Sequence, residues 1–307
     1  MAFWSQRLLE YGLTNLRCFV RPSGKLENLK KILSERSNAK SVELVSGDLL
    51  SREDCRKATQ DVAVIIHLAA GMEKSFAGAF MNSALATRNL LDAFVEVGKP
   101  KRFVNVSSFA VYSNLSLKRN SLLDETCPLE TASQERFDAY GFGKLKQEEI
   151  IREYAKHYRL PCVTLRPGYV FGAGKQELNG RVGIKIFGPF IQVNVTPGID
   201  GEVFNIVDDD LLTARQFLKS YKVAKRFRSV SVPYCVAYSA CYAWEKYSNW
   251  SKGQLPPAFN RRRCAANWKS QRYSNEKLKT RLGWKPRVPM EQAMKTFLAQ
   301  FGTNGRG

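Results

Sequence analysis

Two side chains with complementary acid–base chemistry stand four residues apart at Tyr140 and Lys144, in the stretch Tyr-Gly-Phe-Gly-Lys. On a helix this spacing places both side chains on one face. A nearby ammonium favours the phenolate, so the pKa of a tyrosine falls towards the range in which a phenol exchanges protons at neutral pH. The pair is therefore a candidate general acid/base, although the same spacing also occurs on solvated helix faces.

A proton-transfer pair needs a further group to hold the substrate, and the predicted strand in residues 102–112 carries candidates for it. The run is apolar and contains two adjacent hydroxyls, Ser107 and Ser108. In open α/β sheets, ligands bind at the carboxyl edge of the strands. The serines are therefore candidates for holding a substrate oxygen; the alternative is that they end the strand or cap the next element.

Together with these residues, several segments resemble in their order the extended short-chain dehydrogenase/reductase superfamily, the NAD-dependent epimerase/dehydratase group. The resemblance covers nearly the whole chain. It rests on the strand ends at residues 45–49 and 62–71, the Arg-Pro-Gly loop at 163–174, and the carboxyl-terminal motifs at 273–279 and 282–286.

The resemblance implies a catalytic role for three residues. Tyr140 would exchange a proton with a substrate hydroxyl or carbonyl, and Lys144 would bind the cofactor ribose and lower the tyrosine's pKa. Ser108 would hold the substrate oxygen; it is preferred to Ser107 because it lies four residues before Tyr112.

The resemblance also implies NAD or NADP as cofactor. Besides Tyr140 and Lys144, its contacts would come from Arg21, Asp48, Leu68, Ala69, Ala70, Pro167 and Gly168. Arg21 stands where an acidic residue would bind the NAD ribose, which favours NADP. A further family position, a helix asparagine, aligns with Ser83, and Asn82 lies one residue earlier.

The expected fold class is α/β, a Rossmann-like doubly wound parallel sheet with a smaller carboxyl-terminal substrate domain. We expect the dinucleotide-binding domain in residues 1–175 and the substrate region in 176–307, with the strand at 203–207 returning to the sheet. With 307 residues and 44% hydrophobic composition, the chain is large enough to bury a sizeable core.

Two departures from the family pattern complicate this expectation. The first strand and its glycine-rich turn have no counterpart, since no glycine precedes Gly12, and a strand and helix are missing between Gln192 and Gly201. Without the turn, we expect weak dinucleotide binding and exposed strand edges. Two functions stay open: an NAD(P)-dependent oxidoreductase, epimerase or dehydratase acting on a hydroxyl-bearing substrate such as a nucleotide sugar, or a non-catalytic or truncated family member that keeps the fold.

Cysteine and histidine usage argues against a metal centre. The seven cysteines are spread singly and only His67 and His157 supply imidazoles, so we expect no metal site. An odd cysteine count and the lack of an amino-terminal signal sequence favour a reducing, cytoplasmic location.

The chain is strongly basic, with 48 Lys and Arg against 28 Asp and Glu, a net charge of +20. Its densest clusters are Arg261–Arg263 and Lys225–Arg228. Such a surplus can attract nucleic acid, anionic lipid or an anionic substrate such as a nucleotide sugar, but for any one cluster we favour a solvated surface. Base-reading motifs are absent, so nucleic acid is not expected.

The stretch at residues 232–244 is rich in aromatic residues and is followed by Glu245 and Lys246. It is too short to span a membrane, which takes about 20 apolar residues. We favour a helix packed on the substrate domain over a helix lying in a membrane interface. Besides the small-molecule substrate, two kinds of partner stay open: a second copy of the chain in a homodimer, and a membrane surface contacted peripherally.

Overall fold

The computed structural model describes residues 5, 8–13, 15–22, 26–34, 42–72, 74–168, 201–210, 212–224, 232–252, 254–286 and 288–302. Three features discussed above lie outside them: residues 169–174 of the Arg-Pro-Gly loop, the junction at 193–200 and the cluster Lys225–Arg228. The chain divides into two compact units. Unit 1 comprises residues 1–107, 142–164 and 197–202, and unit 2 comprises 108–141, 165–196 and 203–307. Because these units interleave along the sequence, the domain ranges 1–175 and 176–307 stay a prediction.

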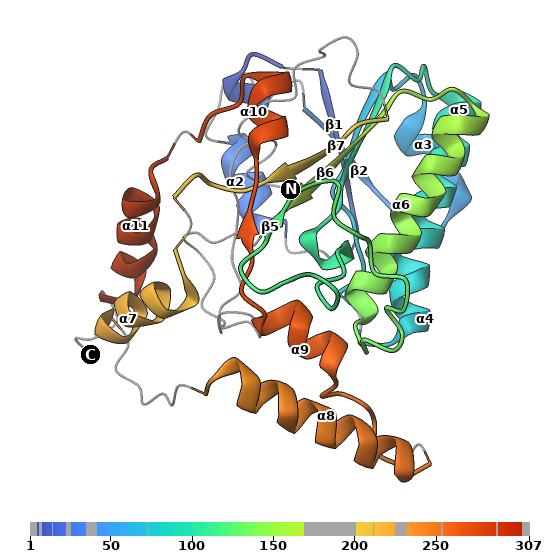
Figure 1. Cartoon of the computed structure of the whole chain (residues 1–307). Helices are drawn as coiled ribbons and strands as arrows, with labels where there is room; N and C mark the ends of the chain where they lie inside the picture. Colours follow the sequence, from blue (N-terminus) through green and yellow to red (C-terminus); the bar gives the residue numbers. More distant parts are fainter. Residues whose placement is uncertain are drawn as a thin grey trace. The chain divides into compact units, whose positions relative to one another are not determined.

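Unit 1 alternates strands and helices, which confirms the predicted α/β class (Figure 1). Helix α6 and strand β6 each contribute residues to both units. The elements are β1 (Leu16–Val20), α2 (Glu27–Ser34), β2 (Val42–Ser46), α3 (Arg52–Thr59), β3 (Val64–His67), α4 (Phe76–Ala79), a π-helical segment (Phe80–Leu85), α5 (Ala86–Val97), β4 (Arg102–Val106), α6 (Ala139–His157) and β6 (Cys162–Pro167).

The described strands of the main fold form two separately hydrogen-bonded sheets. Strands β1 and β2 pair in parallel, with Leu16 opposite Val42. The second sheet has the order β3-β4-β6-β7, where β7 is Val203–Ile206, and β3 runs parallel to β4. Among the described residues no strand joins β1 to β3, so each has one side without a strand neighbour in the part of the chain that the structure describes.

One hydrophobic core holds the second sheet against α3, α5 and α6. Phe103 of β4 is fully buried and packs in one cluster with Leu91 and Phe94 of α5 and Ile151 of α6. The spacing of Leu90, Leu91 and Phe94 gives α5 the apolar stripe that a helix needs to cover a sheet. The parts of β3, β4, α5 and α6 that lie in unit 1 therefore belong to one packed body.

The two-stranded sheet has a smaller core of its own. Cys18 and Val20 of β1 and Leu29 of α2 are its buried members. Arg17 adds a polar link, because its guanidinium donates to the backbone oxygens of Ala58 and Gln60 at the end of α3, at 3.2 and 2.8 Å. Within the described residues, the apolar core of β1 and β2 is thus small.

Unit 2 contains short strands and five of the helices assigned within the described residues. One of its hydrophobic cores joins α7 to α11 through Phe217, Tyr221 and Phe297. The remaining elements are a 3-10 turn (Phe109–Val111), β5 (Leu122–Leu123), α7 (Ala214–Ala224), α8 (Tyr234–Trp250), α9 (Arg261–Trp268), β8 (Arg272–Tyr273), α10 (Glu276–Leu282) and α11 (Met290–Gly302), and β5 pairs in parallel with β8.

Hydrogen exchange should separate the two sheets of unit 1. Two strands over a small core open locally more easily than strands inside a large one. We expect the amides of β1 and β2 to exchange about tenfold or more faster than those of β4, measured by native-state exchange with mass spectrometry. Equal protection of Val20 and Val104 would contradict two separately stabilised sheets.

Candidate active site

Lys144 is the most constrained residue of the candidate site. Its side chain is almost fully buried, and its ammonium donates to the backbone oxygen of Val106 at 2.7 Å and to the side-chain oxygen of Gln147 at 2.9 Å. Burial lowers the pKa of Lys144 to about 7, opposed by the charge of Glu148. Two of its three N–H donors are used, which leaves one for a ligand.

A close helix contact makes this burial possible. A Cβ at Gly143 would lie 2.9 Å from the hydroxyl oxygen of Ser83 and 3.0 Å from the backbone oxygen of Ala79. Only a glycine allows α6 to approach the π-helical segment this closely. Lys144, the next residue, thereby lies close to the end of β4, where its ammonium contacts Val106.

Gln147 connects Lys144 to the strand end that we predicted to lie beside the cofactor. An ammonium only donates, so the Gln147 oxygen must be the group facing Lys144 and its amide nitrogen must be the donor elsewhere. That nitrogen lies 2.7 Å from the Thr87 hydroxyl, 2.9 Å from Nε2 of His67 and 3.2 Å from the backbone oxygen of Ala69. Gln147 itself is fully buried.

His67 is a neutral member of this buried cluster. Its ring lies 5.6 Å from that of Phe103, and burial together with the charge of Lys144 lowers the pKa of His67 to about 3. The Thr87 hydroxyl lies 2.9 Å from Nε2 of His67 and donates its proton to the backbone oxygen of Ser83. His67 is thus part of the core, and its Nε2 accepts a hydrogen bond from Gln147.

Ser83 and Asn82 differ in where they point. Ser83 is buried, and its hydroxyl accepts from the backbone N–H of Gly71 at 2.9 Å. Asn82 is half-buried and accepts from the guanidinium of Arg21 at 3.4 Å. Ser83 therefore holds the inward position of the π-helical segment and fixes the turn after β3.

The two serines at the end of β4 have different partners. Ser107 is buried and donates to the carboxylate of Glu148 on α6 at 2.6 Å. Ser108 caps the following 3-10 turn, since its hydroxyl oxygen accepts from the backbone N–H of Ala110 at 3.1 Å. The capping alternative is therefore real for Ser108, but a hydroxyl that accepts from a backbone still has a proton to donate.

The start of α6 is fastened to this same turn within unit 2. The buried Arg136 donates to the backbone oxygens of Ala110 and Tyr112 and lies 2.9 Å from the carboxylate of Asp138. Asp138 in turn accepts from the backbone N–H of Gly141 at 2.9 Å. These contacts position Tyr140, which is half-buried, one helical turn before Lys144 on α6.

Gly168, which follows Pro167 at the end of β6, lies against the same turn. A Cβ at Gly168 would be 3.4 Å from the Phe109 ring and 2.8 Å from Val207, so the strand end packs closely there. Arg166 before them is buried and donates to the hydroxyl of Tyr112 at 3.0 Å. Unit 2 thus gathers the elements that carry Ser108, Tyr140 and Gly168.

The remaining predicted cofactor residues belong to unit 1. Arg21 follows β1 and is exposed, and Asp48 follows β2, is half-buried and accepts from the backbone N–H of Leu50 at 3.0 Å. Leu68, Ala69 and Ala70 follow β3; Ala69 is exposed and the other two are half-buried. All five stand just after the carboxyl ends of strands, the edge where ligands bind in such sheets.

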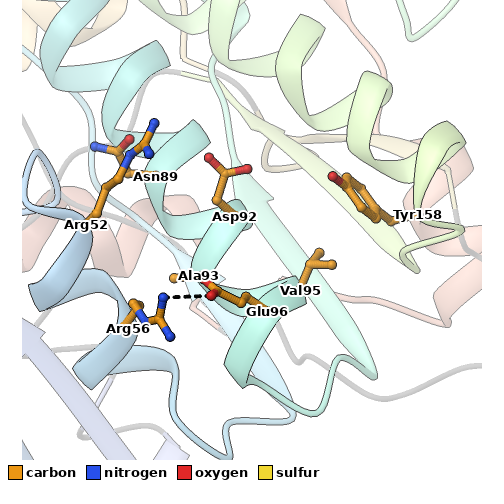
Figure 2. A pocket seen from close by; sticks show the side chains of 8 residues that line it. All are labelled: Arg52, Arg56, Asn89, Asp92, Ala93, Val95, Glu96 and Tyr158. Carbon is orange, nitrogen blue, oxygen red and sulfur yellow. Dashed lines mark hydrogen bonds and ion pairs between the residues drawn. The ribbon is translucent and has the colours of Figure 1, made fainter.

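A pocket of about 430 Å³ lies away from these residues, between α3, α5 and the residue after α6 (Figure 2). The ion pair of Arg56 with Glu96, 2.6 Å long, crosses it, and Asp92 on its wall accepts from the hydroxyl of Tyr154. These contacts tie α5 to α3 and α6. The pocket contains no predicted site residue.

Sequence reasoning missed Gln147 and Glu148. They follow Lys144 by three and four residues and so lie on the same inward face of α6. A signal was present, because polar residues at helix positions facing a sheet must find partners or remain unsatisfied. Their partners, on β3, α5 and β4, become visible only in the structure.

A sequence model of the NAD dependent epimerase/dehydratase family matches residues 6–196. That is more than half of the 307 residues, and the chain belongs to this family, as the motifs predicted. GDP-mannose 3,5-epimerase 1 of Oryza sativa subsp. indica is 29% identical over 141 residues, which cover 44% of this chain and 36% of that protein. The chain thus aligns with about a third of this curated relative.

Solved structures confirm the Rossmann-like parallel-sheet fold. The crystal structure of gox2253 superposes with a TM-score of 0.73 at 19% identity, covering 98% of this chain and 94% of that one. UDP-glucuronic acid 4-epimerase from Bacillus cereus, in complex with NAD, gives a TM-score of 0.65 at 19% identity, covering 98% and 96%. Identity this low shows the fold alone, and the roles of Ser108, Tyr140 and Lys144 stay predictions.

The burial of Lys144 predicts a distinct pH dependence of stability. Its pKa falls from the usual 10.5 to about 7 on folding, so between these values the unfolded chain binds the extra proton. Stability from this group should then increase as the pH rises from about 7 to 10.5 and stay flat below 7. Chemical denaturation of the wild type and Lys144→Met across this window should diverge by several kcal/mol. Lys101→Met, which removes an exposed lysine, is the control, and parallel curves for wild type and Lys144→Met would contradict the lowered pKa.

Proposed function

We propose that this chain is an NAD(P)-dependent enzyme of the epimerase/dehydratase type, acting on a hydroxyl-bearing substrate of the nucleotide-sugar class. One observation carries the proposal: the buried ammonium of Lys144 is held at the end of β4, one helical turn from Tyr140. Membership of the NAD-dependent family supports it. So does the relative GDP-mannose 3,5-epimerase 1, whose name gives a nucleotide-sugar substrate.

The described residues suit both ends of a dinucleotide. Asp48 offers a carboxylate at the carboxyl end of β2, and Lys144 has one donor left for a ribose hydroxyl. When bound, the nicotinamide ring supplies a hydride acceptor and donor. For the pyrophosphate, residues 8–13 and 15–22 contain no glycine-rich turn between a strand and a helix.

The chain's own groups would then perform the proton chemistry. The phenol oxygen of Tyr140 takes the proton of the substrate hydroxyl as the carbon loses hydride, and returns it in the reverse step. The positive charge of Lys144 on the same helix face stabilises the phenolate. The Ser108 hydroxyl donates to the substrate oxygen and holds it near Tyr140.

Removing the transferable proton should stop turnover. With UDP- or GDP-sugars supplied together with NAD or NADP, Tyr140→Phe should lower kcat by about 10²-fold or more. Cofactor affinity should stay within a few-fold of the wild type, because only one hydroxyl is lost. Tyr154→Phe, a matched change further along α6, should keep normal turnover. Near-normal turnover of Tyr140→Phe would refute the catalytic assignment.

A second candidate is a family member that keeps the fold but binds dinucleotide weakly. The observation favouring it is the separation of β1–β2 from β3–β4–β6–β7 in the described residues. Pyrophosphate binding in this fold uses the turn after a strand between those two groups. Calorimetric titration with NAD and NADP distinguishes the candidates, because low-micromolar affinity for either supports the enzyme and undetectable binding of both supports the second.

The same titration tests the cofactor preference. Arg21 is exposed at the end of β1, where its positive charge can meet the 2′-phosphate of NADP. Arg21→Asp should therefore weaken NADP binding about tenfold more than NAD binding. An equal effect on both cofactors would remove Arg21 from the ribose-binding residues.

A further inference from the structure

Helix α8 packs through only one side. Cys241 and Ser248 are its buried residues, and α9 lies alongside it in unit 2 (Figure 1). The loop after α8 adds two hydrogen bonds on this packed side, from Ser248 to the backbone oxygen of Leu255 and from the Trp244 indole to that of Pro256. The interpretation of this stretch as a helix packed on its own domain therefore applies to this side of α8.

The other side of α8 is exposed and apolar. Val236, Tyr247 and Trp250 are 54%, 51% and 76% exposed, and with Ala243 they recur at helical spacing along one line. Val232, just before the helix, is also exposed, at 58%. Among the ten exposed residues of α8, Lys246 is the one with a charge. A solvated helix face normally carries several charges, so an exposed face with so few is unusual for a helix in contact with water.

The chemistry of this face fits the boundary between water and lipid. The rings of Tyr247 and Trp250 stack with their centres 5.8 Å apart at the end of the helix. Tyr and Trp combine an apolar ring with a polar tip, and they are enriched where acyl chains meet headgroups. Lysine is depleted in the buried cores of protein interfaces, so the exposed lysines beside these rings favour a lipid surface over a protein partner.

The charge beside this face is positive. Lys246 and Lys252 are exposed, and the one acidic residue of α8, Glu245, is in an ion pair with Arg261 at 2.9 Å. Arg262 is likewise paired with Glu130 and Glu135. Arg261 and Arg262 are thus engaged in ion pairs within unit 2. Lys246, whose ammonium also lies 5.6 Å from the centre of the Tyr242 ring, and Lys252 are placed to meet an anionic surface, on a chain of net charge +20.

We infer that the exposed face of α8 docks this protein on an anionic membrane surface, with α8 lying in the interface. The rings of Tyr247 and Trp250 enter the headgroup region, and Lys246 and Lys252 contact acidic headgroups. No helix in the described residues is long and apolar enough to cross a membrane, which agrees with docking rather than spanning.

The test is co-sedimentation of the whole chain with phosphatidylcholine vesicles containing about one-third phosphatidylserine. We expect strong binding at low salt, weakened by added salt and by Lys246→Glu/Lys252→Glu. Because any basic protein is attracted to such vesicles, the decisive variant is Tyr247→Ser/Trp250→Ser, which leaves the charge unchanged. It should reduce the partition coefficient about tenfold or more.

Tyr158→Ser is the matched control, since it removes a ring of similar exposure, 47%, from outside α8. It should bind as the wild type does. Equal binding by the wild type and Tyr247→Ser/Trp250→Ser would overturn the inference, as would equal binding to purely phosphatidylcholine vesicles. A dimer in size-exclusion chromatography that this double variant dissociates, without vesicle binding by the wild type, would assign the face to a second copy of the chain instead.

Discussion

The burial of one positive charge organises the candidate site. Taking the Lys144 ammonium out of water costs several kcal/mol unless its donors are satisfied, and the backbone oxygen of Val106 and the side-chain oxygen of Gln147 satisfy two of them. That orientation of Gln147 then directs its amide nitrogen to His67 and Thr87. A single buried charge thus sets the relation of α6 to the ends of β3 and β4 and to α5, through residues that are themselves buried.

The position of Tyr140 depends on the same helix. Its spacing from Lys144 is a property of α6, so the helix itself carries the phenol and the ammonium in a fixed relation. Just before the helix, the guanidinium of Arg136 donates to the backbone oxygens of Ala110 and Tyr112. These bonds link the start of α6 to the 3-10 turn. Gly141 leaves room for this guanidinium, since a Cβ there would lie 2.2 Å from it. The contacts that place Tyr140 and the contacts that bury Lys144 are therefore separate, although both residues belong to α6.

The sequence predicted what depends on local pattern and missed what depends on distant partners. Apolar runs predicted the strands at β3 and β4, and the four-residue spacing predicted that Tyr140 and Lys144 share a helix face. The π-helical segment carries no sequence signal of its own, and the packing of its Ser83 against Gly71 and Gly143 is seen only in the structure. The Arg261–Arg263 cluster looked like a solvated surface, but Arg262 pairs with Glu130, 132 positions away, which no local pattern reveals.

The hydrogen bonds of Lys144 and Gln147 together involve β3, β4, α5 and α6 and none of the residues of β1 or β2. Lys144 and the strands β1 and β2 are consequently supported by different parts of unit 1, while Ser108 and Tyr140 belong to unit 2. Because the larger core contains Phe103 and Ile151 whereas β1 has its own small core, one part can change without loss of the other. An enzyme and a weak dinucleotide binder would thus share the whole arrangement around Lys144 and differ between β1 and β3. It follows that the arrangement around Lys144 does not by itself report on cofactor affinity, which has to be judged from the other sheet.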